Sequence, residues 1–364
     1  MRRTAVKNLK NGMELARTIM SQDGRILLHS GIVLNETYIK RLIELGISSV
    51  YIKDEIFGDY EVQDVISEKT RLEAIKVITN NINWLKKNHN LNIRAVKNVV
   101  DSIISELLDN RNLLINLSDI RCFDDYTFAH SVNVCTLSIL VGITMNYDIT
   151  QLSEIGIGAL LHDIGKIKID IDILNKPSTL TREEYKQIKL HPGYGFEILR
   201  NYNDIPLLSS HVAFQHHEHW NGQGYPRKLG GTKINKYARI VAVTDSCDAL
   251  LSDRPYRLGY SLNHTSYILK RMSGIQLDPD CVTALMANIA VYPIGTIVKL
   301  NTGDIGIIVD VNRDSPTRPI IRIVFNSYGR RLSELHEVDL SKFSSIVIVK
   351  ILNETDVEAL VSNS

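Results

Sequence analysis

Histidines crowd into one stretch of the chain. Seven of the 11 lie in the 90 residues from 130 to 219, where even scatter would place fewer than three. They are His130, His162, His191, His211, His216, His217 and His219. Imidazole is a common metal ligand, and helices that each contribute one or two ligands to one point build a metal centre. The crowding therefore predicts a metal site.

Two of these histidines lie in strongly apolar surroundings. Apolar residues at helical spacing, from Val134 to Val141, follow His130 on the same face, so His130 is predicted to point into the core. There it is either a metal ligand or a hydrogen-bonded core histidine. His162 and Asp163 end another apolar helix, and two buried polar groups are costly unless they are hydrogen-bonded or bind an ion.

The later candidates come as a histidine pair and a carboxylate pair. Adjacent helix positions diverge by about 100°, so His216 and His217 can share an ion only if the helix ends or distorts there, which the glycine-rich loop after them permits. Asp245 and Asp248 lie three residues apart, on one face of an otherwise apolar helix. Buried carboxylates in that setting need partners.

Taken in order, these motifs resemble the HD-GYP family of cyclic di-GMP phosphodiesterases. The resemblance covers about residues 119–285 and is strongest in the HHE-x-x-x-G-x-GYP stretch with an HDIGK sequence before it. The matching residues are His130, His162-Asp163-Ile164-Gly165-Lys166, His191-Pro192, His216-His217-Glu218, Gly222, Gly224-Tyr225-Pro226 and Asp245.

The resemblance implies a centre of two divalent metal ions. One ion would be held by His130, His162, Asp163 and Asp245, and the other by Asp163, His191, His216 and His217. Five imidazoles and two carboxylates without a thiolate favour iron or manganese over structural zinc. Some relatives with three metals use a glutamate one helical turn before the first histidine; this chain has Tyr126 there, so two ions are expected.

The resemblance also assigns catalytic and substrate contacts. Asp163 would bridge the ions, and Lys166 would protonate the leaving oxygen or hold a phosphate oxygen, unless it is an ordinary solvated lysine. Arg254 and Arg257 match a basic pair that grips phosphate, although the family often has lysine at the second position. Tyr225 and Asp248 complete the expected substrate contacts, and the loop with Tyr225 either shapes the site wall or is a structural turn.

Composition agrees with a folded enzyme. The 364 residues are 44% hydrophobic and 23% charged, which excludes disordered, fibrous and membrane-spanning classes. A formal net charge of +1 gives no basic field for duplex nucleic acid or anionic lipid. The four cysteines lack a C-x-x-C spacing, and no signal peptide or 18-residue apolar run occurs, so we expect a reduced, cytoplasmic protein.

The elements that must position these residues are mostly helical. We expect an HD-type helical bundle with a small α+β module at 1–56 and a small β-rich, barrel-like module at 286–364. Residues 57–118 form a helical segment that packs on the catalytic domain, 119–285, or pairs two subunits as a homodimer. The strands of the last module are expected at 296–300, 305–311, 320–325 and 345–351.

The predicted function is metal-dependent hydrolysis of cyclic di-GMP to linear pGpG, or on to GMP, which lowers the level of a bacterial second messenger. Two alternatives remain. The chain could be an HD-type phosphohydrolase of another nucleotide, or a non-catalytic sensor that binds cyclic di-GMP or signalling proteins. A missing ligand would favour the sensor, and none of the seven is missing.

Overall fold

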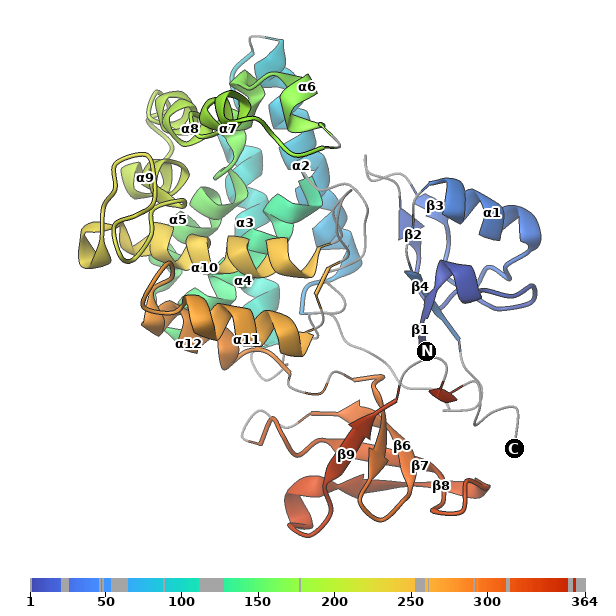
Figure 1. The fold of residues 1–364 in the computed structure, drawn as a ribbon. Coiled ribbons are helices and arrows are strands. Elements are labelled where there is room, and N and C mark those ends of the chain that lie inside the picture. The colour runs from blue at the N-terminus through green and yellow to red at the C-terminus, as the bar shows by residue number, and fades with distance from the viewer. Residues whose placement is uncertain are drawn as a thin grey trace.

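The fold consists of a helical body, a small N-terminal module and a C-terminal sheet (Figure 1). The structure is a computed structural model. The structure describes residues 2–20, 26–45, 47, 49–53, 65–87, 89–110, 128–176, 178–252, 259–260, 262–290, 292, 294–311, 315–352 and 356–357. Most of the described chain is helical, as expected.

The helical body contains the expected histidines and aspartates. Its helices are α2 (Glu68–Lys86), α3 (Ile93–Asp109), α4 (Phe128–Thr144), α5 (Ile149–Leu160), α6 (Ile171–Leu174), α7 (Arg182–Ile188), α8 (His191–Leu199), α9 (Leu207–Gln215), α10 (Lys236–Leu251), α11 (Leu262–Met272) and α12 (Pro279–Met286), with 3-10 turns η2 (Ile164–Lys168) and η3 (Gly231–Lys233). Among the described residues, no helix is both long and apolar enough to cross a bilayer.

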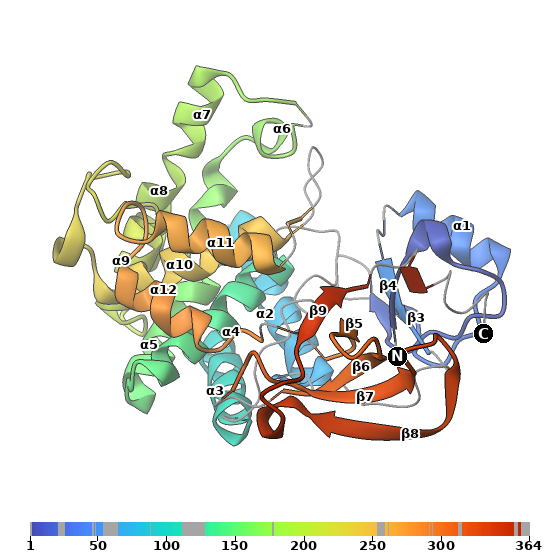
Figure 2. The same cartoon turned by 60° about the horizontal axis from the view of Figure 1, so that its bottom comes forward.

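One hydrophobic core runs through this body. Buried residues of α2 and α3, such as Ile75 and Val100, belong to the same apolar cluster as Ile139 of α4 and Ile155 of α5. Helix α4 is buried on almost every side, which matches its nearly uninterrupted apolar sequence. The described part of the segment 57–118 therefore packs within its own chain (Figure 2).

The N-terminal module has its own small core. Strand β1 (Arg2–Ala5) pairs antiparallel with β4 (Ser49–Ile52), and β2 (Ile19–Met20) pairs with β3 (Ile26–Leu28). A 3-10 turn, η1 (Val6–Asn8), and helix α1 (Glu36–Glu44) complete it. The side chain of Asn35 accepts a hydrogen bond from the backbone of Tyr38 and so begins α1.

The C-terminal module is an open antiparallel sheet, so the expected barrel-like shape is wrong. Its strands are β5 (Ile297–Leu300), β6 (Ile305–Asp310), β7 (Ile320–Phe325), β8 (Arg331–Asp339) and β9 (Ile348–Ile351), with a 3-10 turn η4 (Leu340–Lys342). The strand order is β8-β7-β6-β5-β9. A barrel needs its two edge strands to pair, and in the described residues β8 pairs with β7 while β9 pairs with β5.

Candidate metal centre

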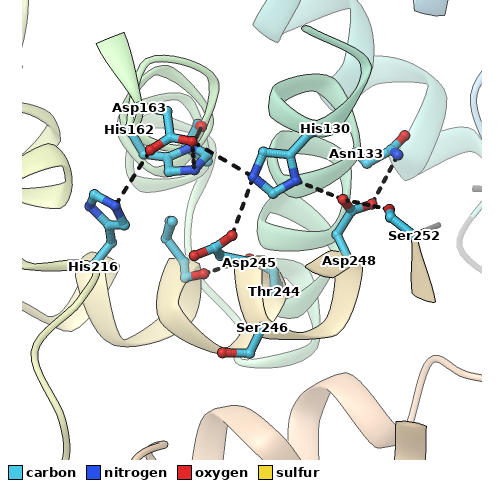
Figure 3. Close-up of polar contacts among 12 residues, drawn as sticks. His130, Asn133, His162, Asp163, His216, Thr244, Asp245, Ser246, Asp248 and Ser252 are labelled. Carbon is cyan, nitrogen blue, oxygen red and sulfur yellow. Dashed lines mark hydrogen bonds and ion pairs between the residues drawn. The ribbon is translucent and has the colours of Figure 1, made fainter. Parts of the chain in front are cut away.

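Most of the predicted ligands lie at or beside helix ends that meet at one place in the body, and Asp245 lies within α10. His130 lies in the first turn of α4, and His191 is the first residue of α8. His162 and Asp163 lie between the end of α5 and η2. Figure 3 shows how His130, His162, Asp163 and His216 point toward one another, above Asp245 on α10.

The end of α9 lets neighbouring histidines face one point. Helix α9 ends at Gln215, so His216 caps it and His217 lies outside the helix. The ring centroids of the two histidines are 4.1 Å apart. The condition for the pair to share an ion, that the helix ends or distorts there, is therefore met.

A glycine brings two ligand-bearing elements together. A Cβ added to Gly165 would lie 2.0 Å from the backbone oxygen of His191 and 2.4 Å from the backbone nitrogen of Gly195. Only a residue without a side chain lets η2 approach α8 this closely. The HDIGK glycine thus places Asp163 against His191.

The carboxylate of Asp163 lies between two groups of imidazoles. Its Oδ2 is 3.4 Å from Nε2 of His162 and 3.9 Å from Nε2 of His130. Its Oδ1 is 3.3 Å from Nε2 of His191 and 3.8 Å from Nε2 of His216. Oδ2 therefore faces His130 and His162, and Oδ1 faces His191 and His216. This is the arrangement of a bridging ligand.

Four of these histidines direct the same nitrogen to the centre. His162, His191 and His216 each place Nδ1 within 3.0 Å of a backbone carbonyl oxygen, and His130 places Nδ1 2.6 Å from Oδ2 of Asp248. Because a carbonyl or carboxylate oxygen accepts, the hydrogen is on Nδ1. Such outer hydrogen bonds leave Nε2 to bind an ion.

The unpaired atoms fit a metal ion. Nε2 of His162 and Oδ1 of Asp163 are buried without a hydrogen-bond partner. Nε2 of His191 and Nε2 of His216 lie 3.3 Å apart, although their Nδ1 atoms are both held by carbonyls. Two acceptor nitrogens at this distance need a cation beside them.

Among the described residues, three groups of side chains could hold an ion, and the ligand atoms within each group lie within 4.8 Å of one another. They are His130, His162 and Asp245; His191, His216 and His217; and His162, Asp163 and His216. The third group shares His162 with the first group and His216 with the second.

Burial keeps three imidazoles in the metal-binding form. It lowers the pKa of His191 and His216, and lowers that of His217 to about 3. Neutral imidazole is the form that binds metal. Burial alone would raise the pKa of Asp163, but the charge of Lys166, followed by the contact with the imidazole of His162, holds it well below its usual range.

The side of the centre formed by His130 and Asp245 is more strongly ionised than the side formed by His191, His216 and His217. Burial opposes a charge on His130, yet hydrogen bonds to Asp245 and Asp248 raise its pKa to about 10, so an ion bound at Nε2 would replace the proton that Nε2 donates to Asp245. Burial likewise opposes a charge on Asp245, and the hydrogen bond from His130 outweighs it and lowers the pKa of that carboxyl. Both carboxylates of the centre are therefore ionised near neutral pH.

Lys166 and Tyr225 lie beside the centre. Nζ of Lys166 donates to Oδ2 of Asp163 at 2.5 Å, and the lysine side chain is 26% exposed. The ring of Tyr225 stacks on His217 with centroids 4.8 Å apart. Nζ of Lys189, which the sequence analysis did not single out, lies 5.0 Å from the centre of the Tyr225 ring.

The expected role of Asp248 is not supported. Asp248 is 0% exposed, and its oxygens accept hydrogen bonds from Asn133 and Ser252 as well as facing His130. A carboxylate enclosed in this way supports His130 rather than contacting a substrate. Arg254, Arg257 and Tyr126 lie outside the described residues.

Two supporting residues had no role assigned to them from the sequence. Glu218 is buried and accepts from the backbone nitrogens of Arg227 and Leu229, so it anchors the loop after the histidine pair. Asn133 is one helical turn after His130 and donates to Asp248. The three-residue spacing from His130 was the available signal for Asn133, whereas the partners of Glu218 become clear only in the folded loop.

Comparison with known proteins supports the family resemblance. The HD domain model matches residues 104–281, and a model described as a KOW domain associated with HD domain matches residues 297–360. The chain is 32% identical over 244 residues, or 67% of its length, to a cyclic di-GMP phosphodiesterase of Pseudomonas aeruginosa. That match covers 59% of the relative.

Two further relatives act on cyclic dinucleotides according to their names. A cyclic di-GMP phosphodiesterase of Thermotoga maritima is 37% identical over 187 residues, 51% of this chain and 50% of the relative. A 3'3'-cGAMP-specific phosphodiesterase of Vibrio cholerae is 32% identical over 168 residues, 46% of this chain and 36% of the relative. The chain thus spans about half the length of the relatives it matches, and the predicted resemblance to cyclic di-GMP phosphodiesterases with an HD domain is confirmed.

Proposed function

Residues 104–281 belong to the HD domain family, and on that premise we propose that the chain is a metal-dependent phosphodiesterase that hydrolyses cyclic di-GMP. The observation that carries the proposal is the carboxylate of Asp163, whose two oxygens face two separate groups of histidines. Phosphodiester hydrolysis commonly uses a pair of metal ions held in this way.

The two ions would be held by distinct ligand sets that share Asp163. His130, His162 and Asp245 would hold one, and His191, His216 and His217 the other. Imidazole and carboxylate ligands without a thiolate favour iron or manganese. The unpartnered Nε2 of His162 and Oδ1 of Asp163 support this assignment.

When bound, the ions supply Lewis acidity, which makes a water nucleophilic near neutral pH and neutralises charge on the phosphate. The chain's own residues position the substrate and move the proton. The ammonium of Lys166 lies 2.5 Å from Asp163 and is partly exposed, so it can reach a substrate held at the centre. Its proton would pass to the ribose oxygen that leaves when the phosphodiester bond breaks.

Substrate contacts would come from both sides of the centre. Tyr225, whose ring stacks on His217, would contact the substrate at the wall of the site. Lys189 beside that ring adds a positive charge. Arg254 and Arg257 remain the predicted phosphate contacts, by resemblance to the family.

We also propose the division of the chain. Residues 1–56 and 286–364 would be separate modules, since each has its own apolar clusters. Residues 57–118 and 119–285 would act as one unit, because α2 and α3 share the core of the helices that carry the ligands.

A second candidate substrate is 3'3'-cGAMP, because one of the relatives is named for that activity. The two cyclic dinucleotides share their sugar–phosphate ring and differ in one base. Initial rates with equal concentrations of each, and with both together, would give the ratio of kcat/KM values that decides between them.

The test of the proposed function is turnover by the metal-loaded protein. Protein purified without oxygen would be loaded with iron(II) or manganese(II), incubated with cyclic di-GMP and compared with Asp163→Ala by nucleotide chromatography. We expect linear pGpG or GMP that is absent with the variant. Protein that holds both ions and forms neither product would refute the proposal.

A further inference from the structure

A chain of hydrogen bonds links helix α2 to the metal centre. We propose that Arg71 and Asn133 are positioning residues that act through Asp248 and fix the imidazole of His130 for metal binding. The inference rests on the proposed function only in that it takes His130 as a metal ligand. It assigns a role to a helix that precedes the region matched by the HD domain model.

Three contacts make up the chain. Nη1 of Arg71 donates to Oδ1 of Asn133 at 2.9 Å. Nδ2 of Asn133 donates to Oδ1 of Asp248 at 2.9 Å. Oδ2 of Asp248 lies 2.6 Å from Nδ1 of His130, whose Nε2 is 3.2 Å from Asp245 (Figure 3).

The register of two helices builds the support into the centre. His130 and Asn133 are three residues apart on α4, and Asp245 and Asp248 are three apart on α10. Residues at this spacing share a helix face. Each helix therefore presents one candidate ligand and, one turn further on, one supporting side chain.

Asp248 fixes which nitrogen of His130 can bind an ion. A carboxylate oxygen accepts a hydrogen, so the contact with Asp248 keeps the hydrogen on Nδ1 and turns Nε2 toward Asp245 and Asp163. Partners of this kind orient metal-binding histidines and increase their basicity.

Arg71 fixes which way the amide of Asn133 points. The two ends of an amide have nearly the same shape, so the side chain could also turn its oxygen toward Asp248. Two acceptor oxygens would then face each other in a buried site, where Asn133 is 6% and Asp248 0% exposed. Because a guanidinium can only donate, Arg71 holds the amide oxygen and leaves Nδ2 for Asp248.

The test measures metal affinity without nucleotide. Manganese(II) would be titrated into metal-free protein in competition with a chelator, which resolves the two ions by affinity. We expect Asp248→Asn to lower the affinity for the ion that His130 binds by about 10- to 100-fold, the usual cost of losing an outer-shell partner. We expect Arg71→Met to weaken the same ion by about 3- to 10-fold, the net effect of one hydrogen bond. The other ion should bind as in the wild type.

A double variant separates positioning from general damage. If Arg71 acts through Asp248, then adding Arg71→Met to Asp248→Asn should lower the affinity for that ion no further. The matched control is Ser138→Ala, which removes a buried 2.7 Å hydroxyl contact to Thr244 between the same two helices, α4 and α10. This control should bind both ions normally, and thermal unfolding would show that every variant folds.

Three results would overturn the inference. They are equal weakening of both ions by Arg71→Met, a Ser138→Ala effect as large as that of Arg71→Met, and additive effects in the double variant. Wild-type protein that binds neither manganese(II) nor iron(II) would refute the inference and the proposed function together. Normal metal behaviour without cyclic di-GMP turnover would refute the proposed function alone.

Discussion

The closest approach of two ligand-bearing elements gives the sharpest prediction. In Gly165→Ala, the new Cβ would lie 2.0 Å from the backbone oxygen of His191, whereas ordinary contact begins at 3.4 Å. The difference, 3.4 − 2.0 = 1.4 Å, must come from movement of η2 or α8, because the neighbouring atom belongs to the backbone. Asp163 and His191 must then separate.

A displacement of this size has two measurable effects. Oδ1 of Asp163 and Nε2 of His191 are now 3.3 Å apart, and a misplacement of about 1 Å at a reacting centre costs about 100-fold in rate. Forced overpacking also lowers the free energy of unfolding by about 1–3 kcal/mol. We therefore expect Gly165→Ala to weaken the ion on the His191 side and to lower kcat about 100-fold, in titration, turnover and urea unfolding.

The matched control lies on α8, the helix that Gly165 approaches. A Cβ added to Gly193 of α8 meets nothing within 4 Å, so Gly193→Ala should leave metal binding and turnover unchanged. Its helix should gain at most about 1 kcal/mol in stability. If Gly165→Ala behaved like Gly193→Ala in all three assays, the close approach would not be what positions His191.

Three further predictions concern the proton donor, the loop and the tie between α2 and α3. Lys166→Met should slow cyclic di-GMP turnover about 100- to 10,000-fold, the usual range for a general acid, but should slow bis(4-nitrophenyl) phosphate hydrolysis much less, because nitrophenolate leaves without a proton. Equal losses on both substrates would exclude Lys166 as the acid. Glu218→Gln should lower the free energy of unfolding by about 1.5–3 kcal/mol, since the amide cannot accept from the backbone nitrogens of both Arg227 and Leu229; unchanged urea unfolding would contradict this. Burial opposes the charge on Glu106, yet hydrogen bonds from Thr70 and Ser67 lower its pKa below 4.5. The ionised carboxylate therefore stabilises the fold fully above about pH 4.5, and this stabilisation is lost as the pH falls through the lowered pKa. Glu106→Gln should therefore flatten the fall of Tm in acid, and an unchanged slope would count against the assignment.

Local features could be predicted from the sequence because short-range physics decides them. The amphipathic stretch 35–45 forms α1, from Glu36 to Glu44, with Asn35 as its cap. Two adjacent histidines could share an ion only if their helix ended or distorted at the pair, and α9 does end at Gln215, directly before His216. The strand expected at 320–325 forms β7 over the same residues.

Other features depend on partners far away in the chain. Strand β8 has a largely exposed, polar sequence, because it lies at a sheet edge, so neither apolar alternation nor an apolar run marks it. Whether a sheet closes depends on the pairing of its edge strands, which no short segment specifies.

The role of Asp248 shows the same limit within the site. Its spacing from Asp245 gave the shared helix face but not the fact that this face meets α4, where His130 and Asn133 surround its carboxylate. The contact between Arg71 and Asn133 joins positions 62 residues apart and has no sequence pattern.

The most direct test of the central claim is anomalous X-ray diffraction from crystals of the manganese-loaded protein at the manganese absorption edge. We expect two peaks, one beside each oxygen of Asp163, with His130, His162 and Asp245 around one and His191, His216 and His217 around the other. A single peak, or two peaks that do not share Asp163, would contradict it.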